Sequence, residues 1–372
     1  RLIRMLVVPL IFTSLVSGVV AMGDPKKLGS IGIKSIGLYL ITTLFAIIIG
    51  LILGTIFKPG NGIDLTGVDP FTSGVASMSV AERLFGIIPM NPFSSLANGE
   101  VLPIIFFSIL LGIGIIMGGD KTKSLGNFFS AAAEAVLKIA HMVMQVAPYG
   151  VLSLVAWVSG TMGLAALQNL LVLTVILYMG CLFHMIFVYG GLIRIFAKLP
   201  LKNFFRGILD AQAVAYSTSS SSATLPVTLQ CVQENLGVKK TVASSVLPLG
   251  ATINMDGTAL YLGIVALFAA QIFGIDLSFT DYLLIAMTVT LTSIGTAGIP
   301  SASLFLLATV LSVIGISDEQ TALIVGFVLP FDRILDMART AVNITGDATV
   351  SVLVAKSENE IDEDVFRENA VL

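Results

Sequence analysis

One polar stretch, DRILDMARTAVNITGD at residues 332–347, carries most of the chemistry that this chain could perform. It lies between two apolar runs, residues 322–331 and 348–355. On a helix its polar side chains fall within one arc of about 120°. They are Asp332, Arg333, Asp336, Arg339, Thr340, Asn343 and Asp347. Charge inside an apolar helix is costly in hydrocarbon and marks a substrate or ion site, with a structural network of ion pairs as the alternative.

The residue types in this stripe suit a small zwitterion that carries a second acid group. Arg339 offers a planar fork of donors for a carboxylate. Asp336 lies one turn away and can accept an ammonium group. A hydroxyl-rich stretch at residues 217–226 adds backbone N–H groups that can hold another carboxylate. Aspartate and glutamate fit this combination.

A second set of residues offers hard oxygen ligands for a cation. It comprises Asn254, Asp256, Asn343 and Asp347. Carbonyl groups freed where a helix is broken add further oxygens, which suits Na⁺. The alternative for Asn254 to Gly257 is a polar kink that satisfies itself, although a buried carboxylate without a cation is costly. We expect Na⁺ as coupling ion and no other cofactor.

Composition places these residues in a membrane. Hydrophobic residues make up 56% of the chain, charged residues make up 12%, and the mean hydropathy is +0.97. Apolar runs longer than about 18 residues predict an all-α polytopic protein with roughly eight passes through the lipid bilayer. Cys181 and Cys231 are expected to be free thiols, because their spacing matches neither a disulfide framework nor a metal site. No nucleic-acid partner is expected.

Loop charges predict the orientation of the chain. Spanning helices are expected at residues 4–22, 36–57, 128–158 and 164–196, and a segmented helix at 84–117. Lys and Arg gather in alternate connections, including Lys121, Lys123, Lys198 and Lys202. The positive-inside rule makes these connections, and the acidic tail after Lys356, cytoplasmic in a cell (inner) membrane.

Two apolar segments enter and leave on one side. Residues 204–233 have basic residues on both flanks and break at 217–226, and residues 282–313 break at 295–300. Both are predicted to be re-entrant hairpins, because irregular backbone at membrane depth is tolerated only in a cavity or inside protein. The breaks align without a gap, since TS at 218–219 matches TS at 292–293 and AxxP at 223–226 matches AxxP at 297–300. Each hairpin precedes a helix with a polar centre, so the pattern predicts the inverted repeat of a transporter.

Four runs, SSSSATLP, GATINMDGT, TAGIP and DMARTAVNITGD, resemble the glutamate transporter family of dicarboxylate/amino acid:cation symporters. The resemblance covers the whole chain. It implies a homotrimer that works as an elevator and a family helix missing before Arg1. It also implies a scaffold helix and a transport-domain helix in 1–57, a segmented scaffold helix and loops in 58–126, and further helices of both domains in 127–198. The two hairpin units, 203–270 and 280–356, would form the transport domain, followed by a cytoplasmic tail at 357–372.

The resemblance also implies roles for particular residues. Ser221, backbone around Ile299 and Asn343 would hold the α-carboxylate, Asp336 the amino group, and Arg339 with Thr258 the side-chain carboxylate. Thr340 would line the pocket, with Ser220 and Ser303 as further substrate-site candidates. Three sodium sites are implied. The first comprises Gly250, Asn254, Asn343 and Asp347, the second Thr252, Ser293, Ile294 and Thr296, and the third Tyr39, Thr42, Thr43, Asn254 and Asp256.

The chain departs from its family at the arginine near the substrate. Ser219 and Met337 stand where archaeal and animal members carry an arginine, so we expect Arg333 to fill the same space. Proton-coupled bacterial glutamate carriers share DRILDMART, whereas Asp347 favours Na⁺ and Arg339 favours acidic over neutral substrates. The alternatives are a proton-coupled glutamate or C4-dicarboxylate symporter, a neutral amino acid carrier and, more remotely, an ion channel.

An enzyme is not expected. Ser219 to Ser222 could suggest a serine hydrolase, but the chain has no GxSxG motif. Its two histidines, His141 and His184, lie on other apolar helices and are expected in the core or at an interface.

Overall fold

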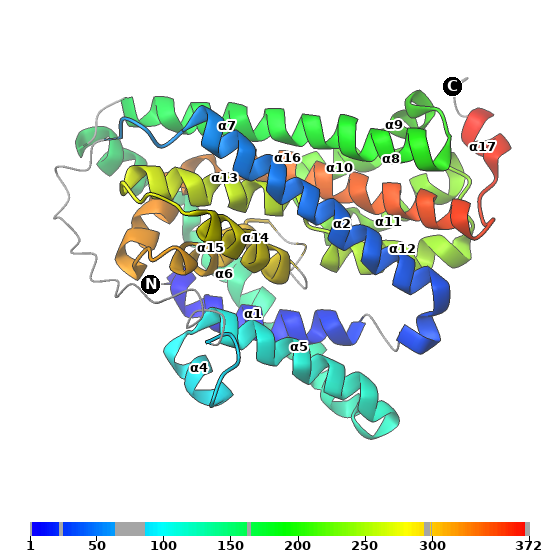
Figure 1. Ribbon diagram of the computed structural model, residues 1–372, viewed down its shortest axis with the longest axis horizontal. Helices are drawn as coiled ribbons and strands as arrows, with labels where there is room; N and C mark the ends of the chain where they lie inside the picture. The colour runs from blue at the N-terminus through cyan, green and yellow to red at the C-terminus, as the bar shows by residue number, and fades with distance from the viewer. Residues whose placement is uncertain are drawn as a thin grey trace.

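The computed structural model describes residues 2–21, 25–63, 86–161, 165–293, 298 and 300–368, and this part of the chain is helical with short connections (Figure 1). The all-helical architecture predicted from the sequence is confirmed. Four described helices are long and apolar enough to cross a membrane, at Gly29–Phe57, Pro103–Lys121, Gln168–Ala197 and Lys240–Ile272. Shorter apolar helices lie at Val8–Val20, Phe279–Ser293 and Ala302–Val313.

Three helices from the first half of the chain pack against one another. α1 (Leu2–Ala21) packs against α5 (Val101–Gly118) and α6 (Lys123–Thr161). Phe12 of α1 stacks on Phe107 and meets Phe129 edge to face. The predicted break in the segmented helix lies at Gly99, whose left-handed backbone ends α4 (Pro92–Asn98) before α5 begins. The 3-10 turn η1 (Gly119–Lys121) leads into α6.

The most deeply buried helix is α13 (Asp256–Ile272), and α2 (Pro25–Phe57) packs along it. The approach is close because α2 carries glycines at the contact. A Cβ on Gly50 would lie 2.5 Å from the carbonyl oxygen of Leu260. Only glycine allows the two backbones to come so near, so this packing is fixed by the sequence of α2.

α7 (Ala165–Phe183) continues through wider helical turns. They are the π-helix η2 (His184–Tyr189), α8 (Gly190–Leu192) and the π-helix η3 (Ile193–Ala197). A π-turn shifts the register of the residues that follow it. His184 and Tyr189 are both fully buried as a result.

The first predicted hairpin is present. α9 (Leu201–Gly207) and α10 (Leu209–Thr218) lead to a tip, and α11 (Ser221–Gln230) with the π-helix η4 (Cys231–Asn235) leads back. Ser219 turns the chain with a left-handed backbone, at φ 54° and ψ 36°. Ser220 caps α11 by accepting a hydrogen bond from the backbone N–H of Ala223 at 3.2 Å. Serines therefore both break the segment and begin the returning helix.

The helix that follows is broken near its middle. α12 (Lys240–Ile253) ends at Asn254, which has φ −88° and ψ 84°, and α13 begins at Asp256. The second unit has α14 (Phe279–Ser293) and α15 (Ala302–Val313). Of its predicted break at 295–300, residues 295–297 and 299 lie outside the described part of the chain.

α16 (Asp318–Ser357) follows the second hairpin as one helix of 40 residues. It begins with a capping box formed by Ser317 and Gln320. The chain then returns through α17 (Glu363–Glu368), whose Phe366 is buried. Asn203 of α9 donates hydrogen bonds to the carbonyl oxygens of Phe366 and Arg367 at 3.1 and 2.9 Å. The tail is thus fastened to the first hairpin.

The connections fall at two ends of the molecule. Those between η3 and α9 and between η4 and α12 lie at the right-hand end of Figure 1, on the side of the C-terminus, and the connection from α5 to α6 lies at the lower right. The connections from α13 to α14 and from α15 to α16 lie at the left-hand end. The basic connections share one end, which agrees with the predicted alternation. Cys181 and Cys231 are buried free thiols, as predicted.

Candidate functional site

The polar stripe of α16 is buried, with one exception. Asp332, Asp336, Arg339, Thr340, Asn343 and Asp347 are all at most 6% exposed. Arg333 is exposed and donates a hydrogen bond to the backbone oxygen of Ser217 at 3.2 Å. It therefore reaches the first hairpin, but it does not line the small cavity described below.

One guanidinium holds two carboxylates at the centre of the stripe. Arg339 Nη2 lies 2.9 Å from an oxygen of Asp332 and 2.9 Å from an oxygen of Asp336. The guanidinium also lies 4.1 Å from the centre of the Tyr261 ring, which favours the cation. Nη1 of Arg339 and Oδ2 of Asp332 have no hydrogen-bond partner among the described residues. The cluster therefore contains two carboxylates and one guanidinium, and the Nη1 group of Arg339 remains available as a hydrogen-bond donor.

The tips of the two hairpins contact each other beside this cluster. Ser220 Oγ donates a hydrogen bond to the carbonyl oxygen of Gly298 at 2.6 Å, and the backbone N–H of Ser222 donates to the same oxygen at 3.2 Å. The second tip also contacts the cluster itself, because the backbone N–H of Ser301 donates to Asp336 at 2.7 Å. A Cβ at position 298 would lie 2.6 Å from Ser222 Oγ and 3.0 Å from the backbone nitrogen of Ser222, so the contact favours glycine.

A small cavity lies between the tips and the two polar helices. It measures about 10 Å³, roughly the space that one water molecule requires. An amino acid is several times larger. The tips must therefore separate before a substrate can enter. Ten residues line the cavity: Ser219, Ser221, Met255, Thr258, Gly298, Ala302, Ser303, Asp336, Thr340 and Asn343.

The first predicted cation site is assembled where α12 ends against α16. Asn254 Nδ2 donates hydrogen bonds to Asp347 Oδ1 at 2.9 Å and to the backbone oxygen of Asn343 at 3.0 Å. A Cβ on Gly250 would lie 2.3 Å from Asp347 Oδ1 and 2.5 Å from the hydroxyl of Tyr39. These oxygens therefore converge on the missing side chain of Gly250. Oδ1 of Asn254 is buried and without a partner in the part of the chain described, so the site keeps an unused acceptor.

Asp256 lies in a neighbouring cluster. Thr43 Oγ1 donates to one of its oxygens at 2.6 Å, and the Tyr189 hydroxyl donates to the other at 2.7 Å. His184 Nε2 lies 3.2 Å from that second oxygen. The Thr42 hydroxyl bonds the backbone oxygen of Tyr39 instead, at 3.1 Å. Of the third predicted sodium site, Thr43 therefore contacts Asp256, whereas the Tyr39 hydroxyl donates to the backbone oxygen of Val246 at 3.0 Å.

The remaining predicted site residues are placed only in part. Thr252 and Ser293 hydrogen-bond backbone oxygens of their own helices. Ile294, Thr296 and Ile299 lie outside the described residues, as does the side chain of His141. The second sodium site and one carboxylate contact depend on these backbone atoms. These two assignments, like the other predicted substrate and sodium sites, stay predictions.

Sequence reasoning missed several residues that contact the site. Tyr189 and Tyr261 touch Asp256 and Arg339, and Met255 Sδ accepts a hydrogen bond from Asn343 at 3.2 Å. Asp332 was part of the polar stripe but not of the predicted substrate site. His184 was expected in the core, where it is, but its contact with Asp256 was not foreseen. The one available signal was a histidine and a tyrosine five residues apart in an otherwise apolar run.

A family model described as the sodium:dicarboxylate symporter family matches residues 1–357. The chain is 36% identical to a proton/sodium-glutamate symport protein of Geobacillus stearothermophilus, over 98% of this chain and 87% of that protein. It is 37% identical to a proton/glutamate-aspartate symporter of Escherichia coli strain K12, over 97% and 84% of the two chains. It is 35% identical to a C4-dicarboxylate transport protein of Bacillus subtilis strain 168, over 97% and 86%.

Proposed function

Because the chain belongs to the sodium:dicarboxylate symporter family, whose members are membrane transporters and not enzymes, we propose that it takes up aspartate or glutamate together with Na⁺. We further propose that it acts as a homotrimer by an elevator motion, with its basic connections and its C-terminus in the cytoplasm. Its relatives are named as a proton/sodium-glutamate symport protein, a proton/glutamate-aspartate symporter and a C4-dicarboxylate transport protein. Substrate and coupling ion must therefore be argued from this chain's own residues.

The single observation behind the choice of substrate is the ratio of charges around Arg339. One guanidinium is shared by Asp332 and Asp336, both buried. A substrate carboxylate that takes the place of Asp336 on Arg339 leaves the acid unpaired, at a cost of several kcal/mol. An ammonium group on the same substrate supplies the missing partner. A plain dicarboxylate has no such group, so the cluster favours an amino acid.

The hairpin tips supply the other half of the recognition. Backbone N–H groups at the start of α11 suit the α-carboxylate, with the Asn343 amide facing them across the cavity. Because the tips touch over the cavity, binding and release both require them to part. This closure separates the site from solvent, as coupled transport requires.

The support for Na⁺ is the geometry around Gly250. A carboxylate, an amide with an unused oxygen, a phenol and a backbone carbonyl lie close together in a buried site. Buried negative charge needs a cation, and hard oxygen ligands of this kind suit Na⁺. A proton on Asp347 would be the other way to neutralise it.

The test is uptake by purified protein in liposomes. Labelled L-aspartate, L-glutamate and succinate are each supplied under an inward Na⁺ gradient and, separately, under an inward H⁺ gradient. We expect saturable uptake of the two amino acids driven by Na⁺ alone, with succinate slower. Uptake driven by H⁺ alone would reject sodium coupling. Uptake of succinate faster than that of aspartate and glutamate would reject the proposal that the substrate is an amino acid. Flux that neither saturates nor follows a fixed ion ratio would indicate a channel.

A further inference from the structure

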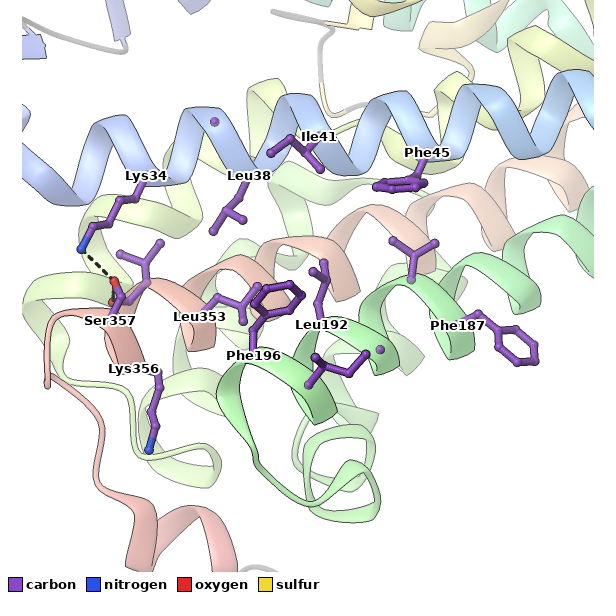
Figure 2. Close-up of a pocket in the computed structure, with 15 residues that line it drawn as sticks. Lys34, Leu38, Ile41, Phe45, Phe187, Leu192, Phe196, Leu353, Lys356 and Ser357 are labelled. Carbon is purple, nitrogen blue, oxygen red and sulfur yellow. Dashed lines mark hydrogen bonds between the residues drawn. The ribbon is translucent and has the colours of Figure 1, made fainter.

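An apolar groove lies on the outside of the molecule, away from the buried polar stripe. Its walls are α2, the segment from η2 to η3, and the C-terminal part of α16 (Figure 2). The groove encloses about 970 Å³. Its apolar lining includes Leu38, Ile41, Phe45, Phe187, Leu192 and Leu353.

The groove opens on a face that contacts lipid. α2 and α7 expose large apolar side chains along their length, and Ile195 and Phe196 continue this face into η3. In a helical membrane protein such a surface lies against acyl chains. The occupant of the groove is therefore drawn from the bilayer.

Two glycines create the space. Gly37 of α2 and Gly191 of α8 both line the groove, and a Cβ at either position would meet nothing within 4 Å. Elsewhere α2 and α13 use glycine to bring helices into contact. Here the glycines leave a gap between helices, so the groove is not filled by neighbouring protein.

One end of the groove is basic. Lys34 and Lys356 line it there together with Ser357, whereas Phe45 and Phe187 lie toward the other end (Figure 2). Lys34 Nζ donates to Ser357 Oγ at 3.0 Å and to Glu358 at 2.6 Å, and Lys356 pairs with Glu363. The Lys34 side chain is 40% exposed and that of Lys356 is 33% exposed. Such exposed pairs are weak, so a phosphate can exchange with the carboxylates.

The length of the groove matches one leaflet. Residues 34 to 45 of α2 span roughly 16 Å at the rise of an α-helix. Half of a bilayer's hydrocarbon core is roughly 15 Å. A lipid with its headgroup at Lys34 would therefore lay an acyl chain along the apolar walls as far as Phe45. Basic pockets between helices at a membrane surface suit anionic headgroups.

We propose that this groove binds an anionic phospholipid, whose phosphate contacts Lys34 and Lys356 and whose acyl chain lies between α2, α8 and α16. The site is independent of the substrate and coupling ion proposed above, because none of the substrate or cation residues lines it.

The test measures lipid that stays bound. Purified protein is equilibrated with vesicles of equal parts phosphatidylglycerol and phosphatidylcholine, re-isolated in detergent, and its lipid is measured by native mass spectrometry. Gly191→Phe fills the groove, and Gly114→Phe on α5 is the matched control, since a Cβ there also meets open space. A Lys34→Gln/Lys356→Gln double variant removes the charges while leaving the groove open.

We expect the wild-type protein and Gly114→Phe to retain phosphatidylglycerol and Gly191→Phe to lose it. The double lysine variant should lose roughly tenfold or more of the preference for the anionic lipid, as two lysines near a membrane surface imply. Equal retention by Gly191→Phe would overturn the proposal, as would equal binding of both lipids by the wild-type protein. Self-association that Gly191→Phe abolishes, without bound lipid, would assign the groove to a second copy of the chain instead.

Discussion

Two helices carry the polar centre of this protein, and they differ in their backbone: one is broken at the centre and the other is continuous. The α12–α13 helix breaks at Asn254 and Met255, and its freed groups lie at the ends of two shorter helices. α16 runs unbroken for 40 residues and contributes mainly side chains, together with the backbone oxygen of Asn343. A broken backbone supplies neutral carbonyl oxygens, which suit a cation. An intact helix holds a guanidinium in a fixed place, which suits a carboxylate.

The two helices meet where the break lies. The N–H of Gly257 donates to Asn343 Oδ1 at 2.8 Å, and a Cβ at position 257 would lie 2.3 Å from the backbone oxygen of Arg339. Asn343 is thus shared, since its side chain meets the start of α13 and its backbone oxygen meets Asn254. In the function proposed above, this shared residue would give a direct route by which cation binding and substrate binding influence each other.

The largest effect is expected from Arg339→Cys in the unbroken helix. It removes the partner of two buried carboxylates, which costs about 3–5 kcal/mol, and it removes the fork for the substrate's side-chain carboxylate. We expect uptake of acidic amino acids to fall by about 100-fold or more, with neutral amino acids gaining relative to them. Competition uptake in liposomes measures this.

Arg333→Cys is the matched control for that variant. It removes an arginine from the same helix without leaving a buried acid unpaired, because Arg333 is exposed and donates to a backbone oxygen. A smaller loss is expected. Equal losses in both variants would contradict the special role of Arg339.

The contact between the two helices is tested by Gly257→Ala. The added methyl group would collide with the backbone of α16, and overpacking of this kind costs about 1–3 kcal/mol. Gly263→Ala on the same helix is the control, because its Cβ would have its nearest neighbour at an ordinary 3.6 Å. Thermal denaturation of the purified proteins compares them. If Gly257→Ala is as stable as Gly263→Ala, the close approach is not required.

Asp347→Asn tests the cation site proposed where the α12–α13 helix is broken. The variant loses the carboxylate that the proposed Na⁺ needs, so its apparent sodium affinity should fall by about tenfold or more. A ligand that binds only the folded state stabilises it by RT ln(1 + [L]/Kd), so the stability rises with ligand concentration and rises less when the affinity is weaker. Melting temperature measured against sodium concentration should therefore rise for the wild type and for the exposed control Asp210→Asn, but much less for Asp347→Asn. Coincident curves would remove Asp347 from the site.

The smallest effect is expected where the tail contacts α2 and the residue before α12. Lys239 N donates to Glu360 O at 3.0 Å, and Glu358 bonds Lys34 and Ser30. Hydrogen bonds from Lys34 and Ser30 lower the pKa of Glu358 below its ordinary 4.5. A lowered pKa contributes stability at neutral pH that is lost as the pH falls through the folded value.

Wild-type protein should therefore be slightly more stable than Glu358→Gln at pH 7, and the difference should vanish in acid below pH 4.5. Melting temperatures over this range measure it. A difference that persists in acid would show that Glu358 acts by packing rather than by charge.

The hairpin tips show how far local sequence reasoning reaches. Four consecutive serines predicted a break, and the break lies there because Ser219 turns left-handed and Ser220 caps the next helix. Both effects act within a few residues. Arg333, by contrast, donates to the backbone oxygen of Ser217, a partner distant in sequence, and its place beside the substrate stays a prediction. The direction of an exposed side chain is decided by the surface it meets.

The sequence by itself determined the elements and their polar faces. Apolar run length, serine and glycine breaks and helical periodicity fixed the two hairpins, the broken helix and the stripe of α16, because each depends on residues near one another in the chain. Only the tertiary structure decided the partners. Arg339 on Tyr261, Ser220 on Gly298, Tyr189 on Asp256 and the open groove beside Gly191 all join segments distant in sequence. Those pairings depend on how helices pack and on the register that the π-turns of η2 and η3 impose, which no local pattern specifies.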